Sequence, residues 1–218
     1  MKKNLLLLLC LFCLVNVCHA KAKDTFTVFQ LNLWNGCTKV PNGDQGIIDV
    51  LDQMDADVVF LCEIRDGKQF IPHVIEELEK RGKHYYGETF DLAIGVLSKF
   101  KPDSWTKCCI VPGDEGRAMV KMVATIEGQP VSFYSCHLDY RHYQCYMPRG
   151  YNGTTWKKMD KPITDEEEVL KANRQSFRDE TIRAFIQEVQ SDIQQGRPII
   201  MGGDFNEPSH LDLSLIHI

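Results

Sequence analysis

Four apolar segments of this chain each end by presenting an acid, an amide or an imidazole, and this pattern constrains the fold more than any other feature. The segments span residues 26–33, 57–62, 131–136 and 199–201. The side chains that they present are Asn32, Glu63, His137 with Asp139, and Asp204 with Asn206. In layered α/β proteins, ligand sites tend to lie outside the carboxyl ends of the strands. One shared site is a better explanation than four separate accidents.

The segment from Arg197 to His210 carries the most informative of these endings. Its apolar run over residues 199–201 predicts a short buried strand, and the two following glycines let the backbone turn tightly and approach a ligand closely. Asp204 and Asn206 are two positions apart on an extended segment, so both can address one point. An Asx-rich turn after a strand is the alternative, and the other three segments make it the weaker one.

The residue types suit metal-assisted hydrolysis of a phosphoester. Glu63 is an oxygen ligand of the kind that Mg²⁺ prefers, and Asn32 can add an amide oxygen or hold a bridging water. His137 can donate to a phosphoryl oxygen. Asp204 can orient or deprotonate an attacking water, and Asn206 can fix the phosphate or that water. The chain has no zinc-type ligand spacing, no Walker lysine loop and no dinucleotide glycine fingerprint.

The ordered motifs resemble those of the endonuclease/exonuclease/phosphatase superfamily, which includes deoxyribonuclease I-like nucleases, inositol polyphosphate phosphatases and neutral sphingomyelinases. The motifs are Leu31–Gly36, Phe60–Glu63, Leu97–Lys99, Ser135–Asp139 and Gly202–Asn206, within a resemblance over roughly residues 25–212. The resemblance implies an α/β (α+β) fold, a four-layer sandwich of two mixed β-sheets flanked by helices.

The same resemblance implies a metal-dependent phosphodiesterase, nuclease or phosphomonoesterase that uses Mg²⁺, with Mn²⁺ as a substitute. It assigns Asn32 and Glu63 to the metal, His137 to the phosphate, and Asp204 and Asn206 to the nucleophile and phosphate. The alternative from another class is a non-catalytic phosphoryl-ligand binding module on the same scaffold. The complete set of five residues disfavours that alternative.

One part of the family pattern is absent. The resemblance calls for a further aspartate and then an Asp-His pair, but only Leu-Ser-Leu-Ile-His-Ile follows Asp212, and His217 comes too soon after Asn206. Residues 213–218 are also the translation of CTG TCT CTT ATA CAC ATC, the end of a transposase-based sequencing adaptor. We therefore expect residues 21–212 to be a truncated, inactive domain that lacks its C-terminal strands, followed by a non-native tail. A natural short variant is the alternative.

The amino end predicts a signal peptide over residues 1–20. Lys2 and Lys3 precede an apolar run from Leu5 to Val17, and Cys18-His19-Ala20 offers small residues to a signal peptidase. The run is short for a bilayer span, so a retained anchor is the weaker alternative. We expect a secreted or periplasmic protein.

Charge and length limit the partners only loosely. Removing residues 1–20 leaves 198 residues, enough for one domain, and changes the formal net charge from −5 to −7 because two lysines leave with no acid. An acidic chain lacks the basic footprint of non-specific nucleic-acid binders, although a bound metal supplies local positive charge. Nucleic acid, a phospholipid headgroup and a sugar or inositol phosphate all stay open as substrates. We expect a monomer without a stable protein partner.

Six cysteines follow the expected signal peptide. Export would permit disulfides, but sequence alone does not give their pairing. Cys62 and Cys136 lie inside apolar strands and are best explained as small buried hydrophobes. The other four are Cys37, Cys108, Cys109 and Cys145.

Periodicity completes the expected order of elements. Helical spacing appears over 47–54 and 70–78, and strand patterns over 93–98, 119–126 and 131–136, the last two joined by a hairpin turn at 127–130. A capping box at Thr164–Glu167 predicts one long helix that ends at Gly196. The expected apolar face of this helix consists of Leu170, Phe177, Phe185, Ile186, Val189 and Ile193.

Residues 140–162 form a long segment rich in aromatic and basic side chains. Loops of this length are usually functional or disordered, and Tyr146 and Trp156 beside His137 suit a substrate with a flat or apolar portion. A surface insertion packed by its own aromatics is the alternative. Further candidates for substrate contact are Asp139, Arg117 and Arg174. Arg174 and Arg178 share a face of the expected long helix, where solvation or salt bridges are the competing explanation.

Overall fold

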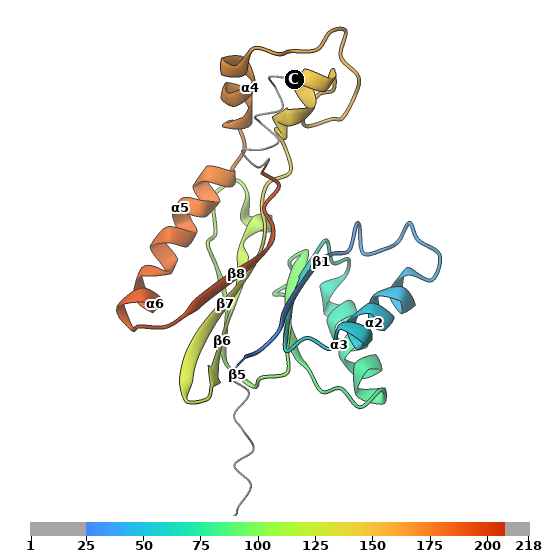
Figure 1. The fold of residues 1–218 in the computed structure, drawn as a ribbon, viewed down its shortest axis with the longest axis vertical. Coiled ribbons are helices and arrows are strands. Elements are labelled where there is room, and N and C mark those ends of the chain that lie inside the picture. Colours follow the sequence, from blue (N-terminus) through green and yellow to red (C-terminus); the bar gives the residue numbers. More distant parts are fainter. Residues whose placement is uncertain (1–24, 208–218) are drawn as a thin grey trace, which may run out of the picture.

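Two four-stranded β-sheets pack face to face in the computed structural model, which describes residues 25–207 (Figure 1). The expected signal peptide, Asp212, His217 and the expected tail lie outside the described residues. Within residues 25–207, no helix is both long enough and apolar enough to cross a membrane.

The first sheet has the strand order β1-β2-β4-β3. Its strands are β1 (Val28–Asn32), β2 (Val58–Cys62), β4 (Ile94–Ser98) and β3 (Tyr86–Glu88). β1 runs parallel to β2, and its last residue, Asn32, pairs with Cys62. The two predicted endings, Asn32 and Glu63, therefore leave the same edge of this sheet.

Two helices cover the outer face of the first sheet, α2 (Gly43–Met54) and α3 (Gly67–Lys80). Both confirm predicted helices, and their buried residues pack on Val59 and Leu61 of β2. Met54 was expected on the buried face of its helix, which is wrong: it is 51% exposed in the last turn. Asp55 then takes a left-handed conformation and ends the helix before Met54 reaches the sheet.

The second sheet has the order β5-β6-β7-β8. Its strands are β5 (Pro102–Cys108), β6 (Met119–Ile126), β7 (Gln129–His137) and β8 (Ile199–Asp204). The β6–β7 turn consists of Glu127 and Gly128 alone, both with positive φ, so the expected four-residue turn was too long. β8 is half-buried instead of buried, because it lies at the edge of the described sheet.

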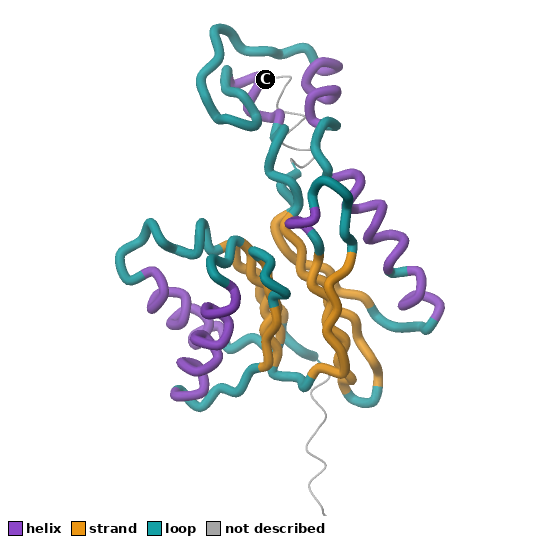
Figure 2. Tube along the Cα trace, turned by 180° about the vertical axis from the view of Figure 1, so that it is seen from behind, coloured by secondary structure: helices purple, strands orange, loops and turns teal. Residues whose placement is uncertain are grey.

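The core between the sheets comes from alternate residues of their facing sides. Val58, Phe60 and Cys62 of β2 meet Val120 and Met122 of β6 and their neighbours in one apolar cluster. Figure 2 shows the two sheets as adjacent layers with helices on the outer sides. The predicted four-layer sandwich of mixed sheets is confirmed.

The predicted long helix after residue 164 is wrong. The chain forms α4 (Glu166–Asn173), α5 (Arg178–Glu188) and α6 (Gln190–Gln194). α4 begins one residue later than the predicted capping box implies, because the Asp165 side chain accepts the hydrogen bond from the Glu168 N–H. The break before α5 is stabilised by Asp139, whose carboxylate accepts the Phe177 N–H at 3.1 Å.

The helices α5 and α6 cover the outer face of the second sheet (Figure 1). Phe185 and Val189 pack against Tyr134 and its apolar neighbours, as the expected apolar face requires, and Ile182, which was not predicted there, joins them. Ile186 and Ile193 were assigned to the same face but are 52% and 56% exposed. The break at 174–177 changes the helical phase, so a face drawn through all six residues does not exist.

The cysteines of the described strands behave as small hydrophobes. Cys62 and Cys136 are fully buried, as predicted. Cys37, Cys62, Cys108, Cys109 and Cys136 are free thiols in the part of the chain that the structure describes. Burial raises the pKa of the Cys62 thiol to about 11, which keeps it protonated and unreactive at neutral pH.

Candidate active site

The four polar strand endings converge where the two sheets meet. The Asn32 side-chain Nδ2 donates to Glu63 Oε1 at 3.1 Å and to Asp204 Oδ2 at 2.9 Å. Asn32 and Glu63 belong to the first sheet, whereas Asp204 ends β8 of the second. Two carboxylates from different sheets therefore face one amide nitrogen, as the strand pattern predicted.

Strand register places the second half of the site. β7 and β8 are parallel, and His137 pairs with Asp204. Beyond this pair, the Leu138 N–H donates to the Asp204 carbonyl at 2.9 Å, and Asn206 Nδ2 donates to the Leu138 carbonyl at 2.9 Å. The Asn206 N–H also closes an Asx turn on Asp204 Oδ1 at 2.9 Å. The Asp204–Asn206 loop is thus tied to the end of β7.

The two glycines before Asp204 are required by close packing. A Cβ at Gly202 would lie 2.4 Å from the Phe60 ring, and one at Gly203 would lie 1.9 Å from the Cys136 carbonyl oxygen. Gly203 also has φ +146, which side-chain-bearing residues rarely adopt. The missing side chains let β8 lie close to β7 in its own sheet and to Phe60 of the first sheet, which places Asp204 beside Asn32.

Glu63 is held by backbone geometry on the other side of the site. Its φ of 59° is a left-handed backbone conformation, so the chain leaves the extended path of β2 at this residue. Its Oε2 accepts the Asn35 N–H at 2.6 Å. The Asn32 Oδ1 atom accepts the Trp34 N–H at 2.8 Å, so the loop after β1 orients both metal candidates.

His137 lies half-buried beside Arg117. Arg117 Nη1 lies 3.5 Å from His137 Nδ1 and donates to the Leu138 carbonyl at 3.2 Å. Burial, and then the positive charge of Arg117, lower the pKa of His137, so the ring is neutral at pH 7. Because a guanidinium has no acceptor, this contact favours the tautomer with its proton on Nε2.

A cleft of about 660 Å³ opens over these residues. Glu63, His137, Arg117, Trp156 and Asn206 line it, each of which was a candidate from the sequence. An adjoining hollow of about 410 Å³ is lined by Asp204, Asn206, Tyr146 and Trp156. Arg174 lines neither, since it is exposed at the carboxyl end of α4. Its contact with substrate stays a prediction.

The cleft also contains residues that the sequence argument missed. Arg65, Asp114 and Tyr140 line it. Arg65 comes two positions after Glu63 and donates to the Asn35 side chain, so its proximity to a strand ending was the available signal. Asp114 reaches the cleft through tertiary packing, and no local pattern marks it. Tyr140 was not named by itself, although it opens the aromatic segment 140–162 that the sequence indicated for substrate contact.

Asp139 lies behind the cleft and has protein partners on both oxygens. Oδ1 accepts from the Arg141 N–H and Nε at 3.0 and 2.6 Å, and Oδ2 accepts from Phe177. Burial raises the Asp139 pKa, but the hydrogen bonds outweigh it, and the net pKa is lowered. Direct substrate contact by Asp139 stays a prediction; the contacts in hand give it a role in positioning residues 139–141 and 177.

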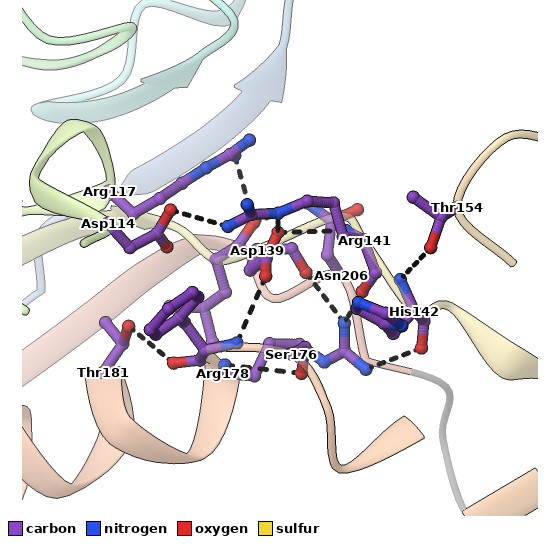
Figure 3. Close-up of polar contacts among 12 residues, drawn as sticks. Asp114, Arg117, Asp139, Arg141, His142, Thr154, Ser176, Arg178, Thr181 and Asn206 are labelled. Atoms are coloured by element: carbon purple, nitrogen blue, oxygen red, sulfur yellow. Dashed lines mark hydrogen bonds and ion pairs between the residues drawn. The ribbon is translucent and has the colours of Figure 1, made fainter. Parts of the chain in front are cut away.

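Arg178 is the centre of the same network (Figure 3). It is 3% exposed, and its guanidinium donates to the carbonyls of Asp139, Arg141 and His142 at 2.8 to 3.2 Å. It also pairs with Glu207, directly after the Asp204–Asn206 loop. The predicted shared helical face of Arg174 and Arg178 is wrong, because α4 ends before Arg178 begins α5.

The donor set fits a divalent cation of the magnesium type. Glu63 and Asp204 form no ion pair with a described lysine or arginine, so the two facing carboxylates have no cationic partner among residues 25–207. Mg²⁺ commonly takes one or two carboxylates and completes its shell with water. No group of three or more His, Cys, Asp or Glu residues suited to a metal occurs in the described part.

Comparison with known proteins places this geometry in a family. The Endonuclease/Exonuclease/phosphatase family model matches residues 29–216. An uncharacterised protein of Caenorhabditis elegans is 27% identical over 190 residues, or 85% of this chain and 54% of that protein. The chain therefore spans about half the length of the curated relative that it matches.

Two solved structures share the fold. D. rerio TDP2, complexed with a single-strand DNA product, has a TM-score of 0.52 and 18% identity, covering 88% of this chain and 64% of that chain. ANGEL2, a 2′,3′-cyclic phosphatase in complex with adenosine-2′,3′-vanadate, has a TM-score of 0.53 and 16% identity, covering 83% and 53%. The chain belongs to the Endonuclease/Exonuclease/phosphatase family.

Proposed function

We propose that the enzyme represented by this chain hydrolyses phosphoester bonds with the help of Mg²⁺, for which Mn²⁺ can substitute. The observation that carries this proposal is the shared contact of Glu63 and Asp204 with the Asn32 amide, because it joins two unpaired carboxylates across the sheets. Family membership and the presence of phosphoesterases among the structural neighbours support the same reaction class.

Different residues of the chain have different roles in the proposed reaction. When bound at Glu63, the cation would polarise a phosphoryl oxygen and offset its charge. Asn32, whose Oδ1 accepts the Trp34 N–H, would hold a bridging water or rotate its amide to offer that oxygen. Asp204 has one oxygen fixed by the Asn206 N–H, and it orients and deprotonates the attacking water. Neutral His137 donates from Nε2 to a phosphoryl oxygen, where negative charge grows in the transition state. Arg117, 3.5 Å from His137, adds positive charge on that side.

The experiment compares hydrolysis with Mg²⁺, with Mn²⁺ and with excess chelator. The substrates are single-strand DNA, RNA, a 2′,3′-cyclic nucleotide, sphingomyelin and inositol phosphates. DNA and cyclic nucleotides come first, because D. rerio TDP2 and ANGEL2 are described with such molecules. Activity that survives chelation would overturn the metal assignment. Binding of these compounds by the full-length protein without turnover would favour the non-catalytic binding module.

A further proposal is export with removal of residues 1–20. The lysines at positions 2 and 3 and the apolar run after them support it. Expression in the native host followed by amino-terminal sequencing should give a mature protein that begins at Lys21. Recovery of the protein in cell extract with its first 20 residues intact would contradict export.

A further inference from the structure

Four exposed aromatic side chains gather beside the candidate catalytic residues. They are Tyr140, Tyr146, Trp156 and Phe205, here called the aromatic wall, and each is more than a third exposed. Three come from the segment 140–162, and Phe205 lies between Asp204 and Asn206. Large apolar side chains grouped on a surface usually mark a binding site.

The aromatic wall lies directly beside the place where the phosphate of a substrate would bind. All four side chains line the hollow of about 410 Å³ that also contains Asp204 and Asn206. Tyr140 and Trp156 line the larger cleft with Glu63 and His137 as well. A substrate with its phosphate between Glu63 and His137 would therefore place a neighbouring group against Trp156.

The segment that carries the wall is folded onto the domain. Residues 144–149 form a 3₁₀ helix, η2 (Gln144–Arg149), and Tyr151 bridges to Lys158. The Tyr143 N–H donates to the Gly153 carbonyl at 3.0 Å, and Arg178 holds residues 139–142 from beneath. These rings are therefore exposed on a segment with defined secondary structure and hydrogen bonds to the rest of the domain. This disfavours the alternative that residues 140–162 are a surface insertion packed only by its own aromatics.

The arrangement of the rings favours a flat ligand over a small organic cation. Tyr140 and Trp156 are in contact, with centroids 5.9 Å apart and planes tilted by 41°, so they do not enclose a point between them. The Arg117 guanidinium already lies over the Tyr140 ring, 5.1 Å from its centroid. Glu207, the other acid of this hollow, is paired with Arg178. Trp156, 58% exposed, still has surface available for stacking.

We propose that the aromatic wall stacks on a planar aromatic ring that the substrate carries next to the phosphate being hydrolysed. This inference rests on the proposed phosphoesterase function and specifies its substrate class. A nucleobase and an aryl ester share this chemistry. Stacking of a base on an aromatic side chain tolerates different bases, because every base has a π-face.

The test uses matched diesters that differ only beside the phosphate. One is a dinucleotide; a second has one base replaced by hydrogen, a third has a phenyl ester, and a fourth has choline at that position. The kcat/KM of the full-length protein should be lower on the base-free diester than on the dinucleotide by on the order of tenfold, mainly through a higher KM. Comparable rates on the dinucleotide and the phenyl ester would indicate any flat ring, and a preference for the dinucleotide would indicate a base.

Variants separate stacking from folding. Trp156→Ala and, in case it unfolds, Trp156→Leu should reduce the ratio of kcat/KM between the dinucleotide and the base-free diester toward one. Ile186→Ala, which alters an exposed side chain on α5, should keep the ratio of the unmodified protein. An unchanged ratio in the folded Trp156 variants, equal rates on both diesters, or a preference for choline would overturn the proposal.

A binding measurement keeps this proposal distinct from the function on which it rests. Thymidine monophosphate and its base-free analogue are titrated into Asp204→Asn, with isothermal titration calorimetry as the readout. Tighter binding of the nucleotide, absent in the double variant with Trp156→Leu, supports the aromatic wall even where no diester is hydrolysed. Equal binding of both compounds refutes it, whatever the catalytic result.

Discussion

Asn32 donates a hydrogen bond to Asp204 at 2.9 Å across 172 positions of the chain and between the two sheets. The site therefore exists only when the sheets have packed, since neither sheet holds both residues. The apolar cluster between the sheets supplies the energy that keeps this contact in place, because it buries Phe60 and its partners completely. Substitutions at the site and substitutions in that core should therefore have separable effects on activity and on stability.

Glu63→Ala should abolish metal-supported turnover. It removes the only carboxylate that the first sheet brings to Asn32, and the half-exposed position makes a large loss of stability unexpected. Calorimetric titration with Mn²⁺ should show loss of binding in parallel with loss of hydrolysis. Glu76→Ala, in an exposed ion pair on α3, is the matched control and should keep both. Normal Mn²⁺ affinity in Glu63→Ala would remove Glu63 from the metal site.

Asp204→Asn should lower kcat by about 10²–10⁴-fold, the range for a lost general base. The amide has nearly the shape of the carboxylate, so the Asx turn with Asn206 and the fold should persist. Circular dichroism and the melting temperature check the fold, and kcat is measured at saturating substrate. A rise in KM alone, with kcat unchanged, would assign Asp204 to substrate binding instead.

Arg117→Met should raise the pKa of His137. Burial is the larger cause of the lowered pKa and stays, whereas the repulsion from the guanidinium is removed. Because the native pKa lies below the unfolded value of about 6.5, His137 lowers stability as the pH falls through that value, and Arg117→Met should lessen this effect. NMR titration of the imidazole resonances measures the shift. An unchanged or lowered pKa would show that Arg117 does not act on this ring.

The sequence predicted the strands that carry the site because each is apolar and ends in a distinctive polar residue. Because β7 and β8 are parallel and His137 pairs with Asp204, the side chains at the ends of these two strands lie next to each other. β3 and β5 were not predicted, because neither has a continuous apolar run: β5 has mostly exposed or half-exposed residues at the edge of its sheet. Local patterning identifies strands with two buried faces better than edge strands.

The break between α4 and α5 could not be read from helical periodicity. It depends on the Asp139 carboxylate and the Phe177 N–H, residues that are 38 positions apart. Arg178 likewise resembles a solvated helical residue in the sequence, yet it is buried against carbonyls of residues 139–142 and of Asn173 at the end of α4. Long-range polar contacts of this kind leave no periodic signal, which also explains why Asp114 was missed in the cleft.

Gly203→Ala should destabilise the fold by more than about 2 kcal/mol, as overpacking and backbone strain combine. The new Cβ would lie 1.9 Å from the Cys136 carbonyl oxygen at a φ of +146. Gly46→Ala is the control, because nothing lies within 4 Å of its Cβ position in α2, and it should stabilise by about 0.5–1 kcal/mol. Urea unfolding followed by circular dichroism measures both, and similar stabilities for the two variants would contradict the packing argument.

Arg178→Met should weaken the site from a distance. It leaves the carbonyls of Asp139, Arg141 and His142 without their Arg178 donor and removes the cation paired with Glu207, which should cost at least about 1–3 kcal/mol. Arg178→Lys should recover only part of this loss, since one ammonium cannot reproduce a planar fork of donors. Arg183→Met, whose side chain is 66% exposed and contacts only Asp179 and Glu180, should change stability by within about 0.5 kcal/mol.

The functional readout for Arg178 is the KM of the dinucleotide, measured well below the melting temperature of each variant. Arg178 holds both residues 139–142, which precede the aromatic wall, and Glu207, which follows the Asp204–Asn206 loop. Its loss should therefore raise KM for the dinucleotide more than for the base-free diester, because the wall shifts relative to the loop. An equal rise for both substrates would mean that Arg178 supports the fold alone, without setting the position of the aromatic wall.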